Sequence, residues 1–284
     1  MLKRKFWRMS FLCQGTYLII AATNGNNLQH STASSSNLID AADPVILNDT
    51  VTGPRVKLNA KAAKFAATYI SDNTEVLEQV RERGKLIFPM IDSILTRYQV
   101  PVEIKYLAVI ESDLRSDALS KVGALGPWQL MPATARILGL KVSHKYDERK
   151  SFKKSTVAAA RYVKDLYAEF GDWLLVIAAY NGGPAPVYSA IRKSGSRNFW
   201  KLQNYLPAET RGHVKRYIST HFFFEGEGSI TTLTKNEMEK YLAAVEKFNT
   251  EKNERAVAAV THYRFSVDSA ISIPSGSGKL IAER

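Results

Sequence analysis

The sequence has almost no cysteine: Cys13 is the only one among 284 residues. A single thiol cannot form a disulfide within the chain, and it offers no thiol cluster for a zinc site. The histidines do not make up for this, because they are scattered along the chain without the spacing of metal ligands. We therefore expect neither a metal nor a cofactor. The five histidines are His30, His144, His213, His221 and His262.

Long apolar runs are also missing. The best candidate, residues 11–22, is short and is interrupted by a Gln-Gly-Thr step, which makes a transmembrane span a poor interpretation. It follows a basic stretch with no acidic residue, an arrangement typical of secretory signal peptides. We expect residues 1–23 to be such a signal peptide, with cleavage near Ala22. Because no small residue directly precedes Cys13, we do not expect lipidation of this cysteine.

Acidic residues are outnumbered, with 27 Asp and Glu against 39 Lys and Arg, which gives a formal net charge of +12. A basic chain suits an anionic polymer, and nucleic acid and cell wall are both candidates. The sequence has no cluster of Lys and Arg interleaved with aromatic residues, so we do not expect nucleic acid as a partner. With 45% hydrophobic residues, the chain can form one sizeable domain with appendages.

The N-terminal part reads as a lead-in to that domain. Residues 24–58 are rich in Ser, Asn, Thr and Ala, which predicts a flexible tether. Helical spacing follows over residues 57–69 and 74–83, and we expect Gly84 to end the second helix. The apolar residues between Leu86 and Tyr98 repeat at helical spacing and predict an amphipathic helix.

These patterns divide the chain into a tether with lead-in helices (24–84), a helical domain (85–228) and a C-terminal extension (229–284). The charged stretch 236–263 predicts a solvated helix or helix pair. The last residues, 263–284, could hold a short strand and a helix. The expected fold class is mainly α.

The stretch from Glu111 to Thr134 carries the strongest chemical signal. Residues 101–110 predict a helix that starts with proline, and Ile104, Leu107 and Glu111 share one face of it. Glu111 should therefore be buried near the C-terminal end of that helix, where desolvation and the helix dipole both disfavour the ionised form. A protonated carboxyl is what a general acid needs. The alternative is a glutamate that turns into solvent, and spacing alone does not decide.

Two further segments carry polar groups in apolar surroundings. Gly123 and Gly126 should bring the backbone close to a ligand or to another segment, and Gln129 needs partners that a sugar or the backbone could supply. Further on, a helix from about residue 155 should end at Gly171. Asp172 should then cap a helix that is apolar on all sides and therefore buried.

That buried helix ends in Tyr180 and Asn181, followed by a glycine break. This arrangement places two hydrogen-bonding groups either at the wall of a cleft or in an ordinary helix cap. The sequence alone leaves both interpretations open.

Four motifs in order resemble the soluble lytic transglycosylase (goose-lysozyme-like) domain, and most of all the membrane-bound lytic murein transglycosylase D type. Each motif is weak alone, but four in the right order and spacing are specific. The resemblance covers about residues 85–222, and it implies a lysozyme-like α-helical domain with a substrate cleft. The motifs are Glu111-Ser112, the Gly-Pro-Trp-Gln-Leu-Met-Pro run at 126–132, the Ala-Tyr-Asn-Gly-Gly run at 179–183, and Glu-Thr-Arg at 209–211.

The resemblance implies a role for each matching residue. Glu111 matches the catalytic acid/base, and Glu209 matches a second acidic residue that shapes the site. Ser112 and His213 are further candidates. His213 stands where many family members have tyrosine, so activity could respond differently to pH. The residues expected to bind substrate are Ser120, Gln129, Met131, Tyr180, Asn181 and Glu209.

The resemblance also implies the reaction, which is cleavage of the β-1,4 bond between N-acetylmuramic acid and N-acetylglucosamine with formation of a 1,6-anhydromuramoyl end. Glu111 would act alone, first as acid and then as base. Asp113 and Asp117 lie in polar surroundings and are expected to be exposed or capping. One alternative is a lysozyme-type hydrolase of peptidoglycan or chitin, in which Asp113, Asp117 or Glu209 helps to activate water. The other is an inactive wall-binding scaffold.

The expected partner is the glycan strand of peptidoglycan. Together with the expected signal peptide, this places the protein in the periplasm or cell envelope of a Gram-negative bacterium. The sequence leaves room for peripheral association with the envelope, and it indicates no oligomeric state.

Overall fold

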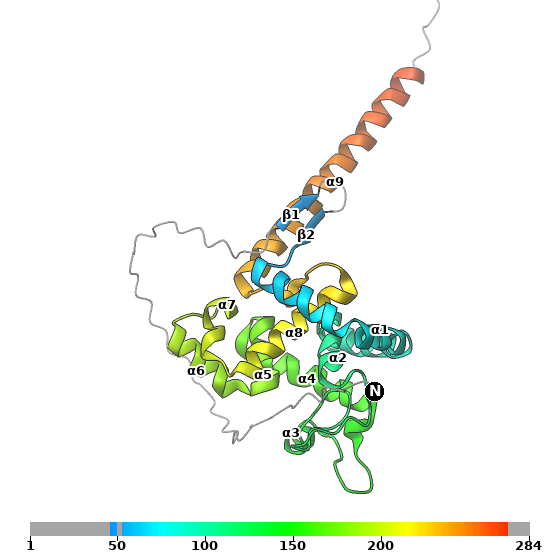
Figure 1. Cartoon of the computed structure of the whole chain (residues 1–284). Coiled ribbons are helices and arrows are strands. Elements are labelled where there is room, and N and C mark those ends of the chain that lie inside the picture. Colours follow the sequence, from blue (N-terminus) through cyan, green and yellow to red (C-terminus); the bar gives the residue numbers. More distant parts are fainter. Residues whose placement is uncertain (1–45, 50–52, 272–284) are drawn as a thin grey trace, which may run out of the picture.

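The computed structural model describes residues 46–49 and 53–271, with side chains for residues 53–261. The described part is mainly helical, which confirms the expected fold class (Figure 1). Its two strands, β1 (Ile46–Asp49) and β2 (Gly53–Val56), pair antiparallel. Both strands fall within residues 24–58, so the prediction of a flexible tether is wrong for 46–49 and 53–56. The expected signal peptide, the tether residues 24–45 and the segment from residue 272 lie outside the described residues.

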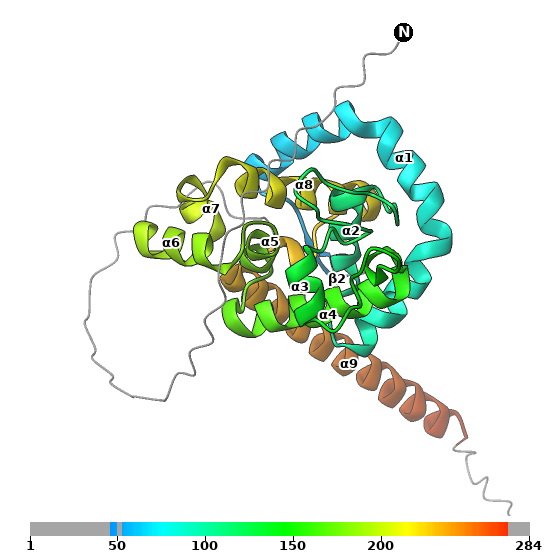
Figure 2. The same cartoon turned by 90° about the horizontal axis from the view of Figure 1, so that it is seen from below.

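The first helix, α1 (Ala60–Arg97), is one element rather than the separate helices predicted. Gly84 does not end it. The Phe88 ring of the next turn occupies the space of a Gly84 side chain, because a Cβ there would lie 2.3 Å from that ring. Pro89 also lies inside the helix, where it removes one backbone hydrogen bond and favours bending. Figure 2 shows α1 curving around the body of the molecule.

The helix that carries Glu111 is only in part an α-helix. It starts as a 3-10 turn, η1 (Val102–Ile104), and continues as α2 (Lys105–Ser112). It ends because Asp113 adopts a left-handed conformation with φ 52°, and its N–H donates to Val109 O over 2.8 Å. Glu111 therefore lies in the last turn, as predicted.

The helix α5 (Trp173–Gly182) is the buried centre of the domain, as its composition predicted. Every residue from Trp173 to Ala179 is buried. It packs against three helices: α4 (Phe152–Phe170), α6 (Pro184–Ser194) and α8 (Ala208–Glu225). Helix α4 begins three residues before the predicted start, because Ser151 caps it by accepting the N–H of Lys154.

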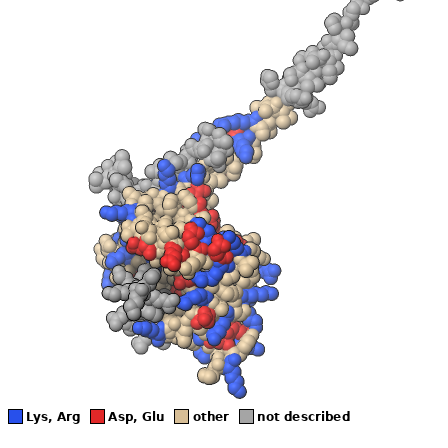
Figure 3. Space-filling model, turned by 45° about the vertical axis from the view of Figure 1, so that its right-hand side comes forward, with Lys and Arg blue, Asp and Glu red and all other residues tan. Residues whose placement is uncertain are grey.

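Two shorter helices and three further 3-10 turns complete the described body. The helices are α3 (Pro132–Ile137) and α7 (Phe199–Leu202). The remaining turns are η2 (Glu148–Lys150), η3 (Gln203–Tyr205) and η4 (Ile230–Thr232). On the face drawn in Figure 3, Lys and Arg side chains lie among Asp and Glu side chains rather than in one separate patch.

The C-terminal extension is a single helix, α9 (Lys235–Ile271), rather than a helix pair. Its first half contacts β2, and the rest extends away from the body with residues 252–261 exposed (Figure 1). Within the described ranges, no helix is long and apolar enough to cross a membrane.

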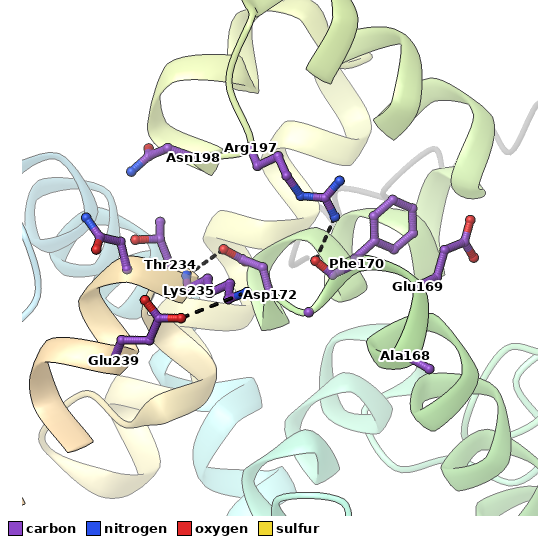
Figure 4. A pocket seen from close by; sticks show the side chains of 11 residues that line it. Ala168, Glu169, Phe170, Asp172, Arg197, Asn198, Thr234, Lys235 and Glu239 are labelled. Carbon is purple, nitrogen blue, oxygen red and sulfur yellow. Dashed lines mark hydrogen bonds and ion pairs between the residues drawn. The ribbon is translucent and has the colours of Figure 1, made fainter. Parts of the chain in front are cut away.

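Asp172 joins α9 to the centre of the domain. It is only 3% exposed, and its two oxygens accept the backbone N–H groups of Leu175 (3.1 Å) and Lys235 (2.7 Å). It therefore caps the start of α5, as predicted, and also holds the start of α9 (Figure 4). Burial raises the pKa of this carboxyl to about 6, although the backbone N–H donors act in the opposite direction.

This raised pKa predicts a pH-dependent stability. Between pH 4 and 6 the folded protein binds a proton at Asp172 that the unfolded chain does not, so this group's contribution to the free energy of unfolding falls as pH rises. The rise of the pKa from 3.8 to about 6 corresponds to a change of ~3 kcal/mol at most in the free energy of unfolding. The free energy of unfolding of Asp172→Asn, taken relative to that of the wild type, should therefore rise by up to ~3 kcal/mol from pH 4 to pH 7. Urea denaturation of both proteins measures this difference.

The comparison with the variant is needed because His221 acts in the opposite sense. Burial lowers the pKa of His221 to about 4, so its contribution to stability rises with pH over the same window. His221 is present in both proteins, and its effect cancels in the difference. A difference between the two proteins that does not change with pH would show that Asp172 titrates normally.

Candidate active site

The site is centred on a buried pair of side chains, Glu111 from α2 and His213 from α8. Their side chains are 2% and 0% exposed, and His213 Nε2 lies 2.9 Å from Glu111 Oε1 in a hydrogen bond. The alternative in which Glu111 turns into solvent is therefore wrong. The second carboxyl oxygen, Oε2, is buried, and it has no hydrogen-bond partner among the described residues.

Charged and polar groups from three other parts of the chain act on this pair. The pKa of Tyr180 lies well above its ordinary value, first because of burial and then because of the nearby Glu111 carboxylate. Burial lowers the pKa of Arg216, while interactions with Tyr69, Glu111 and Glu209 raise it. Tyr180 comes from α5, Arg216 and Glu209 from α8, and Tyr69 from α1. Four helices thus meet around one carboxyl.

The Tyr180–Asn181 pair lies beside this centre and is held by different contacts. Tyr180 donates its hydroxyl proton to Trp128 O over 2.7 Å, which fastens the end of α5 to the loop after α2. Asn181 Oδ1 accepts a hydrogen bond from Thr210 Oγ1 over 3.0 Å. Asn181 Nδ2 is buried without a partner in the part of the chain that the structure describes. The amide therefore has an unused donor, which simple capping does not require.

Gln129 holds the loop rather than facing a sugar with its amide nitrogen. Its backbone has φ 44°, a conformation that is uncommon for a residue other than glycine. Its Nε2 donates to Ala118 O over 2.8 Å and to Gly126 O over 3.0 Å. The backbone therefore supplies the partners that the sequence left open.

Two predicted serines also bond to the backbone. Ser112 Oγ donates to Pro127 O over 2.9 Å, and Ser120 Oγ accepts the N–H of Ala124 over 2.9 Å. These bonds shape the loop that runs from α2 to α3. The remaining predicted residues, Met131 at the start of α3 and Glu209 in the first turn of α8, are both half-buried.

The two aspartates that follow Glu111 differ from each other. Asp117 is exposed, as predicted. Asp113 is half-buried and is the left-handed C-cap residue of α2, which agrees with the expectation of an exposed or capping residue, and burial raises its pKa. Within the described ranges, no group of three or more His, Cys, Asp or Glu side chains is placed to hold a metal ion.

The sequence analysis did not predict the role of Arg149, a buried residue that donates hydrogen bonds to the loop between α2 and α3. Its guanidinium donates to Gly123 O (2.8 Å) and Leu130 O (2.9 Å) and pairs with Asp147 over 2.7 Å. Gly126 lies so close that a Cβ there would be 2.0 Å from Arg149 O. The signal was present in the two closely spaced glycines, but the segment they approach is not evident from sequence.

This contact predicts that glycine is required at 126 for a reason that does not apply at 123. Both residues have positive φ, +86° and +87°, but Gly123 has no atom within 4 Å of a built Cβ. Gly123→Ala should therefore cost only the backbone strain, about 1 kcal/mol. Gly126→Ala should cost about 1–3 kcal/mol more, because the Arg149 backbone must move. Urea denaturation of both variants measures the difference, and equal losses would contradict the close approach.

The pocket drawn in Figure 4 is separate from this centre. It has a volume of about 560 Å³ and lies between the end of α4, the start of α5 and the start of α9. None of its lining residues belongs to the candidate site. The substrate cleft expected around Glu111 remains a prediction.

Comparison with known proteins links this geometry to a family. Residues 89–203 match the family model described as the transglycosylase SLT domain. The chain is 35% identical over 152 residues to membrane-bound lytic murein transglycosylase D of Escherichia coli (strain K12). This alignment covers 52% of the chain and 33% of the relative, so the chain spans about a third of the relative's length. The resemblance seen in the four motifs is confirmed.

Two solved structures are also similar. The 70 kDa soluble lytic transglycosylase of Escherichia coli has a TM-score of 0.46 and 25% identity, over 62% of this chain and 32% of that chain. An inactive mutant of lytic transglycosylase Slt from Pseudomonas aeruginosa has a TM-score of 0.43 and 24% identity, over 49% of this chain and 24% of that chain.

Proposed function

We propose that this chain is a lytic transglycosylase that cleaves the glycan strands of peptidoglycan, because residues 89–203 match the transglycosylase SLT domain model. The observation that carries the proposal is the buried Glu111 carboxyl, which has one oxygen held by His213 and one oxygen without a partner in the described chain. The similar Escherichia coli protein is named as a murein transglycosylase, which supports the same substrate class.

The reaction needs one group that both gives and takes a proton. Glu111 protonates the oxygen of the β-1,4 bond between N-acetylmuramic acid and N-acetylglucosamine, and the bond from C1 to that oxygen breaks. The 6-hydroxyl of the muramoyl sugar then attacks C1 and returns its proton to Glu111. The product ends in a 1,6-anhydromuramoyl unit, and no water is consumed. The nucleophile belongs to the substrate, so no second carboxylate is required to activate water.

The surrounding residues divide into two groups in this proposal. Asn181 has a buried amide donor available for a substrate carbonyl, and Tyr180 and Glu209 line the same centre. Ser120, Gln129 and Met131 shape the loop that faces the glycan strand. A substrate in the cell wall further implies export to the periplasm or cell envelope, which cell fractionation would test.

A hydrolase is the second candidate, and one observation favours it. Glu209 and Glu111 both raise the pKa of Arg216, so a second carboxylate acts on the same guanidinium as the first. Hydrolysis of a glycosidic bond ordinarily uses such a pair, with the second carboxylate acting on water or on the sugar. The two reactions break the same bond and differ in their products.

Product analysis separates the two reactions. Purified peptidoglycan digested with this protein should release muropeptides with anhydro ends, each one water lighter than the product of hydrolysis. Mass spectrometry of the separated muropeptides measures this. Release of reducing ends alone would reject the transglycosylase and leave the hydrolase.

A substitution tests the role of Glu111. Glu111→Gln keeps the side chain's size but cannot transfer the proton, so turnover should fall by about 10²-fold or more. Asp165→Asn is the matched control, because it neutralises an exposed carboxylate on α4 and should leave turnover unchanged. Thermal denaturation should show both variants folded. An active Glu111→Gln variant would move the proposed site elsewhere.

A further inference from the structure

We propose that His213 is the positioning residue of Glu111, holding Oε1 so that the reacting proton is carried by Oε2. This inference rests on the proposed role of Glu111 as the acid/base. It starts from the 2.9 Å hydrogen bond between His213 Nε2 and Glu111 Oε1, which connects α8 to the last turn of α2. Because the His213 side chain is fully buried and its Nε2 is engaged, it acts through Glu111 rather than on substrate.

The two protonation states of Glu111 decide which tautomer of the His213 ring can keep its hydrogen bond throughout the reaction. An ionised carboxylate can only accept hydrogen bonds, so His213 Nε2 must carry a proton when Glu111 is a base. The same Nε2–H can still donate to Oε1 when Glu111 is protonated, provided that the proton sits on Oε2. One ring arrangement therefore serves both halves of the reaction. The opposite tautomer fits only a carboxyl protonated on Oε1, where the proton points at the ring.

The rest of the structure leaves Oε2 for chemistry. Oε2 is buried, and no hydrogen bond to it exists among the described residues, whereas Oε1 is engaged. His213 Nδ1 also has no partner there, so the bond to Glu111 is the ring's single hydrogen bond in the described structure. A ring with one polar contact is oriented by that contact.

The other charged and polar groups around Glu111 and His213 stay the same when His213 alone is changed. They are the guanidinium of Arg216 and the carboxylate of Glu209 on α8 and the hydroxyls of Tyr180 on α5 and Tyr69 on α1, with the carboxylate of Asp113 after α2 acting on Tyr69. Any shift in the pH profile of a His213 variant can thus be assigned to the lost hydrogen bond or the lost imidazole.

The kinetic test uses a matched pair of variants. In His213→Gln the amide nitrogen lies the same number of bonds from Cα as Nε2, so a donor remains near Oε1. His213→Leu fills a similar volume without a donor. We expect His213→Leu to lower kcat by about 10²-fold with little change in KM, because the carboxyl is no longer oriented. His213→Gln should keep kcat within about 10-fold and retain the wild-type pH profile.

Folding and function are separated by further measurements. Thermal denaturation shows whether each variant is folded. If His213→Leu does not fold, His213→Asn replaces it in the test. The asparagine amide lies one bond closer to Cα than the glutamine amide, so His213→Asn should lose as much kcat as is expected for His213→Leu. Equal kcat losses in the glutamine and leucine variants, or no loss in either, would overturn the proposal.

A direct measurement does not depend on activity. In protein with ¹⁵N-labelled histidine, the signals that disappear in His213→Gln belong to His213. Their chemical shifts should show a protonated Nε2 and a bare Nδ1, and a bare Nε2 would overturn the proposal. The proposed function fails separately, when the wild-type protein releases neither anhydro nor reducing ends from peptidoglycan. Release of reducing ends alone would still leave the His213 inference testable, because Glu111 remains the acid.

Discussion

The structure depends on placing one carboxyl where helices meet and water is excluded. A buried carboxyl loses its hydrogen bonds to water and must replace them with hydrogen bonds to protein groups. His213 supplies one such bond to Glu111, at the contact of α2 with α8, while α5 contributes Tyr180 to the same centre. Helix α8 is what allows this, because it packs on the apolar α5 and on α2 and so brings residues from distant parts of the chain to one point.

Local patterns in the sequence were enough to predict the features that depend on residues close to one another along the chain. The spacing of Ile104, Leu107 and Glu111 correctly placed the carboxyl on a buried face, and all three residues are buried. Asp172 before an apolar run was correctly predicted as a helix cap. Gly84 was misread, because a glycine that ends a helix and a glycine that admits a neighbouring ring look alike in sequence. Only the packing of Phe88 distinguishes them.

Contacts between distant segments were beyond this reasoning. His213 was named as a candidate from the family resemblance, but its bond to Glu111 joins residues 102 positions apart, and no periodicity reports such a pair. Arg149 and Arg216 were missed for the same reason. Arg149 is buried and Arg216 half-buried, and the importance of each comes from groups elsewhere in the chain, namely backbone carbonyls for Arg149 and two carboxylates for Arg216.

Two buried carboxyls show how the same residue class can serve stability or chemistry. Both oxygens of Asp172 accept backbone N–H groups, and these two hydrogen bonds join α5 and α9. Glu111 is equally enclosed, yet only Oε1 is engaged. An unsatisfied buried oxygen costs free energy that folding alone would not retain. That cost is explained if a substrate supplies the missing partner, and the unpaired Oε2, more than the burial of Glu111, supports our proposal that this carboxyl is the reactive one.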